Sequence, residues 1–233
     1  MLMPQVLITG AARGLGRALS IEAHRRGCGL WLTVRSETDK AALLTELPGA
    51  NVLIADLTEM DVSDRMAKWL SEVAIDVLIC NAGTGSKGPT VDTATAEQIE
   101  RVLQTNCLGT FATVKGALPA LRRSTQASIV TISSRRGSMA MQAEGAAKGS
   151  GCSYSYRISK AALNMLTLCL ADDLEEEGIT VAAIHPGRLL TKMASSDASM
   201  TPETAAERIW HQIQTGQLVH RSLWSTEKGL LPW

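Results

Sequence analysis

A short apolar run leads directly into a glycine-rich turn at residues 5–16, which read QVLITGAARGLG. The run Gln5–Thr9 is typical of a strand that is buried on both faces. Three glycines follow it: Gly10, Gly14 and Gly16. A helical pattern of apolar residues begins at Leu15. A strand, a glycine turn and a helix in this order leave the N–H groups of the helix N-terminus available to an anion such as a pyrophosphate.

The glycines follow the spacing G-x-x-x-G-x-G, whereas the more common dinucleotide-binding turn reads G-x-G-x-x-G. A tight connection between a strand and a helix would also use glycines, so the spacing alone leaves both interpretations open. Because a strand precedes the turn and a helix follows it, we predict a cofactor-binding turn here. Its predicted contacts are Gly10, Arg13, Gly14, Leu15 and Gly16.

The same alternation of strands and helices continues along the chain. Further strand candidates are Leu30–Val34, Val52–Ala55, Val77–Cys80, Ser128–Ser133, Thr180–Ile184 and Leu218–Leu223. Helix candidates are Leu15–Arg26, Glu37–Leu47, Met60–Val73, Ala96–Arg123, Tyr156–Glu177 and Pro202–Thr215. This spacing implies βαβ units with right-handed crossovers. We therefore predict an α/β fold: a doubly wound, Rossmann-type sandwich with a seven-stranded, mostly parallel sheet, helices on both faces, and a single domain spanning residues 1–233.

The composition excludes several classes of protein. With 45% hydrophobic and 20% charged residues over 233 positions, the chain is not intrinsically disordered. Twenty-three basic and 23 acidic residues cancel, so nothing in the net charge draws the protein to nucleic acid or to an anionic membrane. The five cysteines and four histidines have neither disulfide-framework nor metal-ligand spacing. We expect no metal and, since no signal-like or spanning segment is visible, a cytoplasmic protein.

The end of the second strand candidate indicates which nicotinamide cofactor is used. An acidic residue at that position would bind the ribose 2′-hydroxyl of NAD. Here Val34 occupies the position and Arg35 follows it, while Arg13 lies inside the glycine turn. Two guanidinium groups can converge on a 2′-phosphate, so we predict NADP(H), although both arginines could also be solvated loop residues.

Tyr156 and Lys160 are four residues apart at the start of a predicted helix, which places them on one face. A phenol with an ordinary pKa of about 10 is a poor acid–base group at neutral pH. A neighbouring ammonium favours the phenolate and would lower that pKa. The spacing Tyr-x-x-x-Lys occurs often by chance, but this chain holds only two tyrosines, Tyr154 and Tyr156.

With the glycine turn and this pair in place, the sequence resembles the short-chain dehydrogenase/reductase family over nearly its whole length. Further matching motifs follow in order: Asp56-Leu57, Asn81-Ala82-Gly83, Asn106, Ser134 and Pro186-Gly187 with Thr191 beyond. The segments Tyr154–Met165 and His185–Gly187, and the terminal Leu231-Pro232-Trp233, resemble its C-factor-like and carbonyl-reductase-like branch. The resemblance implies that Asp56 and Leu57 contact adenine, that Asn81, Ala82 and Gly83 also contact the cofactor, and that Pro186, Gly187 and Thr191 contact nicotinamide.

The resemblance also implies a reaction, the reduction of an aldehyde or ketone by NADPH. Tyr156 would donate the proton, Ser134 would bind the carbonyl oxygen, and Lys160 would hold the pKa of Tyr156 down while binding the nicotinamide ribose. Asn106 would hold a water that links Lys160 to solvent. Family members commonly pair through the helices that correspond to Ala96–Arg123 and Tyr156–Glu177, so we expect a homodimer or homotetramer. A nucleotide-binding regulatory protein of the same fold, with little turnover, is the alternative.

Some assignments have structural alternatives that the residues leave open. Strand alternation turns only one of Ser133 and Ser134 toward the site. Asn106 could be a buried structural amide, and Tyr154 more readily packs or lines the pocket than acts in catalysis. Arg135 and Arg136, directly after Ser134, could recognise an anionic substrate or form a solvated turn.

One segment departs from the family pattern. Ser134 and Tyr156 are 22 residues apart, against about a dozen in the family that the sequence resembles. The extra length falls in Ala140–Ser153, whose Gly, Ala and Ser content suits a surface loop. The stretch where many relatives carry a substrate lid, from Thr191 to the helix start at Thr201, is short. We predict that Ala140–Ser153 forms one wall of an open pocket in place of that lid, although it could be a surface insertion without a role.

Overall fold

The computed structural model describes residues 3–190 and 199–233, which form one sheet of eight strands in the order β3-β2-β1-β4-β5-β6-β7-β8. All neighbouring strands are parallel except β7 and β8. The strands are β1 (Gln5–Ile8), β2 (Gly29–Val34), β3 (Asn51–Ile54), β4 (Val77–Cys80), β5 (Ser128–Ile132), β6 (Thr180–His185), β7 (Leu223–Ser225) and β8 (Gly229–Leu231). This architecture confirms the predicted doubly wound α/β fold.

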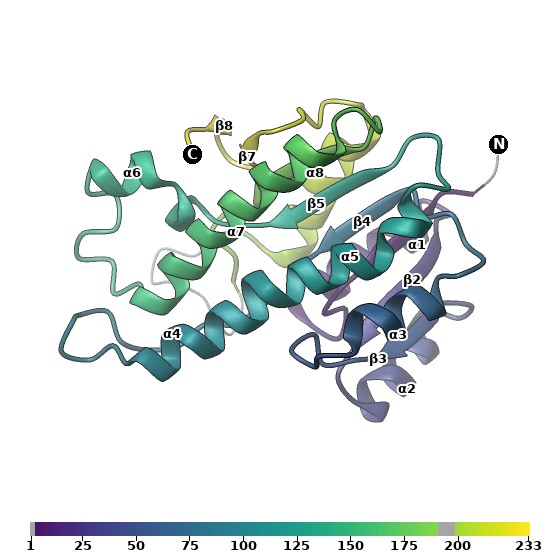
Figure 1. The fold of residues 1–233 in the computed structure, drawn as a ribbon, viewed down its shortest axis with the longest axis horizontal. Helices are drawn as coiled ribbons and strands as arrows, with labels where there is room; N and C mark the ends of the chain where they lie inside the picture. Colours follow the sequence, from purple (N-terminus) through teal and green to yellow (C-terminus); the bar gives the residue numbers. More distant parts are fainter. Residues whose placement is uncertain (1–2, 191–198) are drawn as a thin grey trace.

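Helices cover both faces of the sheet (Figure 1). They are α1 (Gly14–Arg25), α2 (Glu37–Glu46), α3 (Val62–Trp69), α4 (Ala96–Leu103), α5 (Gly109–Leu121), α6 (Met139–Ala143), α7 (Tyr154–Leu174) and α8 (Pro202–Gln214). In β1, Val6 and Ile8 pack with α1, α2 and α8, whereas Leu7 points to the other face and packs with α3, α5 and α7. This alternation of apolar side chains explains why the strands are apolar at consecutive positions.

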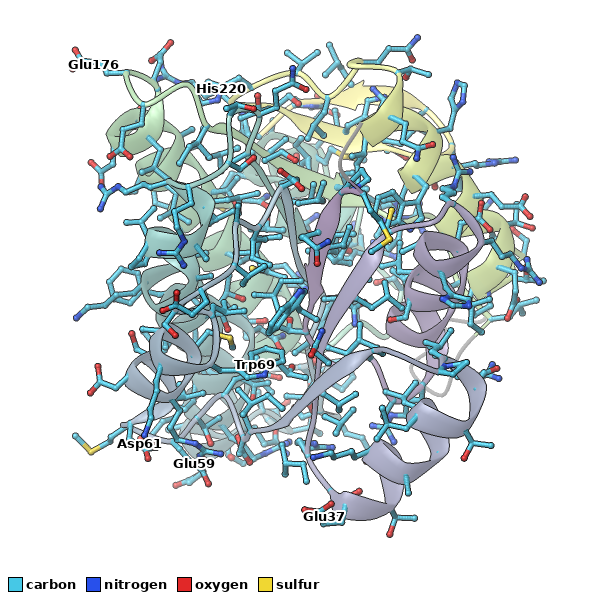
Figure 2. The ribbon with its side chains drawn as sticks, turned by 90° about the vertical axis from the view of Figure 1, so that its right-hand side faces the viewer. Glu37, Glu59, Asp61, Trp69, Glu176 and His220 are labelled. Atoms are coloured by element: carbon cyan, nitrogen blue, oxygen red, sulfur yellow. The ribbon has the colours of Figure 1, made fainter. Side chains whose placement is uncertain are left out.

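The sheet extends from β3 at one edge to the β7–β8 pair at the other. Figure 2 looks at the molecule from the side, with Glu37 and Glu59 near the β3 edge and Glu176 and His220 at the opposite end. Trp69, also labelled there, meets Trp31 of β2 edge-on, with ring centroids 5.0 Å apart. In the described part of the chain, no helix has the length and apolar character needed to cross a membrane.

The structure corrects three sequence-based predictions. The sheet has eight strands rather than seven, because Gly229–Leu231 pairs antiparallel with β7, and β7 itself is Leu223–Ser225 rather than Leu218–Leu223. A three-residue strand with glycine at its start carries almost no periodic signal. The single helix expected over Ala96–Arg123 is divided by a π-helical turn at Gln104–Leu108. The surface loop expected over Ala140–Ser153 begins within the short helix α6.

Candidate active site

The glycine turn lies at the carboxyl end of β1, and hydrogen bonds from the end of β4 hold it in place. The backbone N–H groups of Asn81 and Ala82 both donate to the Thr9 hydroxyl at 3.1 Å. The Asn81 side-chain amide donates to the carbonyl oxygens of Thr9 (2.9 Å) and Gly10 (3.2 Å). A Cβ at Gly16 would lie 2.2 Å from the Gly10 carbonyl oxygen, so only glycine fits there. The structure thus brings two predicted cofactor segments together where the strand order reverses between β1 and β4.

The N-terminus of α1 is suited to an anionic group. The helix begins at Gly14, and its first turn carries no acidic side chain. Leu15 and Gly16 are buried, whereas Arg13 at the N-cap position is exposed and makes no capping hydrogen bond through its side chain. The first N–H groups of a helix have no partner within it and lie at the positive end of its dipole. A phosphate at this end would therefore be stabilised by backbone and side chain alike.

The predicted residues for the adenosine end of a cofactor lie together after β2 and β3. Arg35 is exposed just beyond the buried Val34. Asp56 accepts hydrogen bonds from the backbone N–H (2.9 Å) and the hydroxyl (2.8 Å) of Thr58, which lower its pKa. The positive charge of Arg35 also lowers the pKa of Asp56, so the two side chains lie within electrostatic reach of each other. Leu57 is buried beside them.

Ser134, Tyr156 and Lys160 meet where β5 ends and α7 begins. The Ser134 hydroxyl lies close enough to the Tyr156 hydroxyl to lower the pKa of the phenol. The Lys160 ammonium lies 5.7 Å from the centre of the Tyr156 ring and donates to the Ile132 carbonyl oxygen at 2.6 Å. The arrangement presents a phenol, a hydroxyl and an ammonium to a single small volume, which suits proton transfer to a polar oxygen.

Burial dominates the proton affinities of the two titratable groups. It raises the pKa of Tyr156 to about 12, although the nearby Ser134 hydroxyl acts in the opposite direction. It also lowers the pKa of Lys160 to about 8. The expected lowering of the Tyr156 pKa by Lys160 is not present in this arrangement, where the ammonium is engaged by a backbone carbonyl. A phenolate at neutral pH would need further positive charge beside the ring.

The geometry distinguishes the two serines that follow β5. Ser133 donates its hydroxyl to the side-chain oxygen of Asn164 on α7. The Ser134 hydroxyl acts on the pKa of Tyr156 and accepts from the backbone N–H of Arg136 at 3.1 Å. The tight turn that follows packs directly on α7, since a Cβ at Gly137 would lie 2.5 Å from the backbone of Lys160. Ser134, and not Ser133, therefore contacts the predicted proton donor.

Asn106 lies within the π-helical turn and is almost fully buried. Its side-chain oxygen accepts from the Thr84 backbone N–H at 2.7 Å. Its amide N–H groups donate to the Thr84 carbonyl oxygen and to the Ser159 hydroxyl, each at 2.9 Å. Gly83, next to Thr84, leaves room for this amide. The side chain thus connects the end of β4 to α7, and the role of Asn106 in holding a water stays a prediction.

The remaining predicted segments lie at the other side of the site. Pro186 and Gly187 follow β6 and are buried. Gly187 has a φ of +91°, and a Cβ there would press on Met200 and Thr226 at 3.0 Å. Thr191 lies outside the described residues.

The predicted insertion is a surface segment, as expected from its composition. None of residues 139–152 is buried. Among the contacts that hold it, the Ala140 N–H donates to the Trp233 carbonyl oxygen at 2.9 Å, and the Arg136 guanidinium donates to the Ala146 carbonyl oxygen at 2.6 Å. Its start therefore lies against the C-terminal residues, and Figure 1 places α6 and the C-terminus on the same side of the molecule.

Several supporting residues were missed by sequence reasoning. Thr9 anchors the ends of β1 and β4, Ser159 anchors Asn106, and Asn164 anchors Ser133. Each lies beside a recognised motif or one helical turn from one. The only sequence signal for these three residues was a small polar side chain close to a recognised motif, and such side chains are also common where they support nothing.

The comparisons with known proteins agree with this geometry. The family model described as "short chain dehydrogenase" matches residues 4–202. The NADPH-dependent pterin aldehyde reductase of Arabidopsis thaliana is 31% identical over 196 residues, covering 82% of this chain and 77% of that protein. The C-signal protein of Myxococcus xanthus is 34% identical over 126 residues, covering 54% of this chain and 72% of that protein.

Among solved structures, the carbonyl reductase Sniffer of D. melanogaster superposes with a TM-score of 0.88 at 27% identity, covering 100% of both chains. The whole fold therefore matches. The resemblance seen in the sequence is confirmed: this chain belongs to the short-chain dehydrogenase family.

Proposed function

We propose that this protein is an NADPH-dependent oxidoreductase that reduces an aldehyde or ketone, with Tyr156 as the proton donor. The observation that carries the proposal is the grouping of three side chains: the Ser134 hydroxyl lies close enough to Tyr156 to lower its pKa, and the Lys160 ammonium lies 5.7 Å from the centre of the same ring. A protein that only bound a nucleotide would have no physical need for this trio. When bound, NADPH supplies the hydride that the carbonyl carbon accepts.

Ser134, Tyr156 and Lys160 have different roles in the proposed reaction. As that oxygen gains negative charge, the Ser134 hydroxyl stabilises it and the Tyr156 hydroxyl transfers its proton to it. A pKa of about 12 keeps Tyr156 protonated at neutral pH, which is the form that reduction requires. Lys160 uses one N–H on Ile132, and its remaining donors are available to the hydroxyls of a nicotinamide ribose.

Two arginines support the choice of NADPH over NADH. In residues 3–190 and 199–233 no ion pair engages Arg13 or Arg35, and both side chains are exposed at the adenosine end of the predicted cleft. Charge-assisted bonds to a 2′-phosphate are stronger than bonds to a neutral hydroxyl. The Arabidopsis thaliana relative, named NADPH-dependent, is consistent with this assignment.

The exposed apolar side chains of two neighbouring helices support self-association. Leu108 and Phe111 lie at the π-helical turn and on α5, and Ile158 and Met165 lie on α7. Contiguous exposed apolar surface is a common mark of an interface. We propose that the 233-residue chain acts as one domain and pairs through these helices as a homodimer or homotetramer.

A panel of aldehydes and ketones, assayed by the loss of NADPH absorbance, tests the function. We expect oxidation of NADPH with at least some reactive carbonyls, and none with Tyr156→Phe under the same conditions. Tight NADPH binding without turnover of any carbonyl would contradict the enzyme and favour a nucleotide-binding regulatory protein.

A further inference from the structure

Arginine side chains surround the catalytic residues in a way that the proposed reaction does not by itself require. Arg135 and Arg136 directly follow Ser134, and Arg157 directly follows Tyr156. The backbone N–H of Arg136 donates to the Ser134 hydroxyl oxygen at 3.1 Å. The position of Arg136 is therefore fixed relative to the hydroxyl that contacts Tyr156.

A hydrogen bond ties the side chain of Arg136 to the 139–152 segment. The residue is half-buried, and one guanidinium N–H donates to the Ala146 carbonyl oxygen at 2.6 Å. Its positive charge acts on both the Tyr156 hydroxyl and the Cys152 thiol, lowering the pKa of each against the larger, opposite effect of burial. A solvated turn would not tether the guanidinium across to the 139–152 segment.

Arg157 adds to the same electropositive region. Its guanidinium carbon lies 5.0 Å from the centre of the Tyr154 ring, and its Nε is buried without a hydrogen-bond partner among the described residues. The charges of Arg136, Arg157 and Arg135 all act on the half-buried Cys152. In the part of the chain that the structure describes, no ion pair engages Arg136 or Arg157. Arg136 and Arg157 therefore bring positive charge close to Tyr156, and no acidic side chain of the described residues pairs with either of them.

We propose that the carbonyl substrate carries a carboxylate and that Arg136 binds this carboxylate while the carbonyl oxygen lies against Tyr156. The inference rests on the proposed function and specifies its substrate class. A guanidinium has five N–H donors in a planar fork, and Arg136 uses one of them on Ala146, so donors for a carboxylate remain. Its half-buried position strengthens such a pair relative to one in open water. Arg157 contributes positive charge at the rim.

A matched pair of aldehydes tests the proposal by kinetics. Para-formylbenzoate and para-formylbenzamide have nearly the same shape and differ in charge. We expect kcat/KM with NADPH to be at least about tenfold higher for the carboxylate, the lower end of what a charge-assisted pair supplies. A ratio near one, or a preference for the amide, overturns the proposal while leaving carbonyl reduction in place.

Variants test whether Arg136 causes the preference for the carboxylate substrate. Arg136→Gln should bring the carboxylate-to-amide ratio down to about one, and Arg136→Lys, which keeps the charge without the fork, should give an intermediate ratio. Arg25→Gln removes the same charge from an exposed position at the end of α1 and should leave the ratio as in the wild type. A full wild-type ratio in Arg136→Gln, with an unchanged melting temperature, overturns the assignment.

A binding measurement decides the proposal independently of turnover. Calorimetric titration of para-hydroxymethylbenzoate and the matching amide into the protein with NADPH compares the two product-like ligands in a complex that cannot react. At least about tenfold tighter binding of the carboxylate, lost in Arg136→Gln, supports the site even if no aldehyde is turned over. Equal affinities overturn it, and an absence of turnover together with carboxylate binding counts against the proposed reaction only.

Discussion

The hydroxyl groups of Ser134 and Tyr156 lie close enough to interact although the two residues are 22 positions apart in the chain. Ser134 follows β5, and Tyr156 lies in the first turn of α7. The contact gives both hydroxyls access to one substrate oxygen, so that one can stabilise its charge while the other transfers a proton. The proximity of Ser134 opposes, but does not cancel, the effect of burial on the pKa of Tyr156.

Replacing Tyr156 with Phe should remove catalysis while preserving the fold. The change deletes one oxygen from a ring of unchanged shape, so the melting temperature and the Kd for NADPH should stay near wild-type values. We expect kcat to fall by at least the roughly 10²–10⁴-fold that is typical of a general acid. Steady-state kinetics checks this result. Tyr154→Phe is the matched control and should keep most of the activity, whereas the reverse pattern would show that the wrong tyrosine has been assigned.

NADPH should bind more tightly than NADH. Arg13 and Arg35 can form charge-assisted hydrogen bonds to the 2′-phosphate, each worth about 1.5–3 kcal/mol, or roughly tenfold or more in affinity. Calorimetric titration of both cofactors into the protein measures the ratio, and Arg35→Asp should narrow or invert it. Equal dissociation constants for the two cofactors in the wild type would be inconsistent with the assignment.

The lowered pKa of Lys160 should make stability depend on pH. Burial brings the pKa from 10.5 to about 8, so between these values the unfolded chain binds more protons at this site than the folded chain. The free energy of unfolding should therefore rise with pH across this window. Below about pH 8 the folded protein carries the full cost of a buried ammonium. Relative to Lys160→Met, the wild type should gain about 1–3 kcal/mol of unfolding free energy over this window. Denaturant titrations at several pH values measure this difference; a constant value would mean that Lys160 titrates normally.

Shortening the segment 140–153 to a length typical of the family should change substrate recognition. Residues 140–152 lie at the surface without being buried, and Arg136 reaches them through the Ala146 carbonyl oxygen, so their loss alters the surroundings of the catalytic hydroxyls. We expect a changed KM and a changed ranking of small and bulky carbonyls. The Kd for NADPH serves as the internal control and should stay constant, because the glycine turn lies at a different strand end. Unchanged kinetics across the panel would leave the segment without a role in recognition.

A charged residue on the exposed face of α5 should separate the subunits. Phe111→Asp places a carboxylate within apolar surface, and burying that charge in an interface would be costly. Light scattering after size-exclusion chromatography should show a smaller particle than for the wild type. Met60→Asp, at a fully exposed position outside both helices, is the matched control and should leave the mass unchanged. A wild-type mass for Phe111→Asp would exclude this face as the interface.

Much of the fold could be predicted from local sequence. The apolar strands, the glycine turn and the helix start at Thr201-Pro202 follow from residue types at fixed spacing, because backbone conformation and burial on both faces restrict the residues allowed there. The ends and interruptions of helices and strands were harder to predict from the sequence. The π-helical turn at Gln104–Leu108 and the strand Gly229–Leu231 depend on packing and pairing partners far away in the chain, which no short window of sequence contains.

Some features of the candidate site could likewise be predicted from the sequence, and others depend on the tertiary structure. The sequence by itself determined which residue types were available: the glycine turn, the Tyr156–Lys160 pair on one helical face, and arginines at three of the expected loops. Only the tertiary structure decided that Ser134 rather than Ser133 contacts Tyr156, and that the Asn106 amide is engaged by Thr84 and Ser159. Spacing along the chain restricts neighbours within one element, whereas contacts between β5, α7 and the π-helical turn, and the burial that shifts each pKa, depend on how those elements pack.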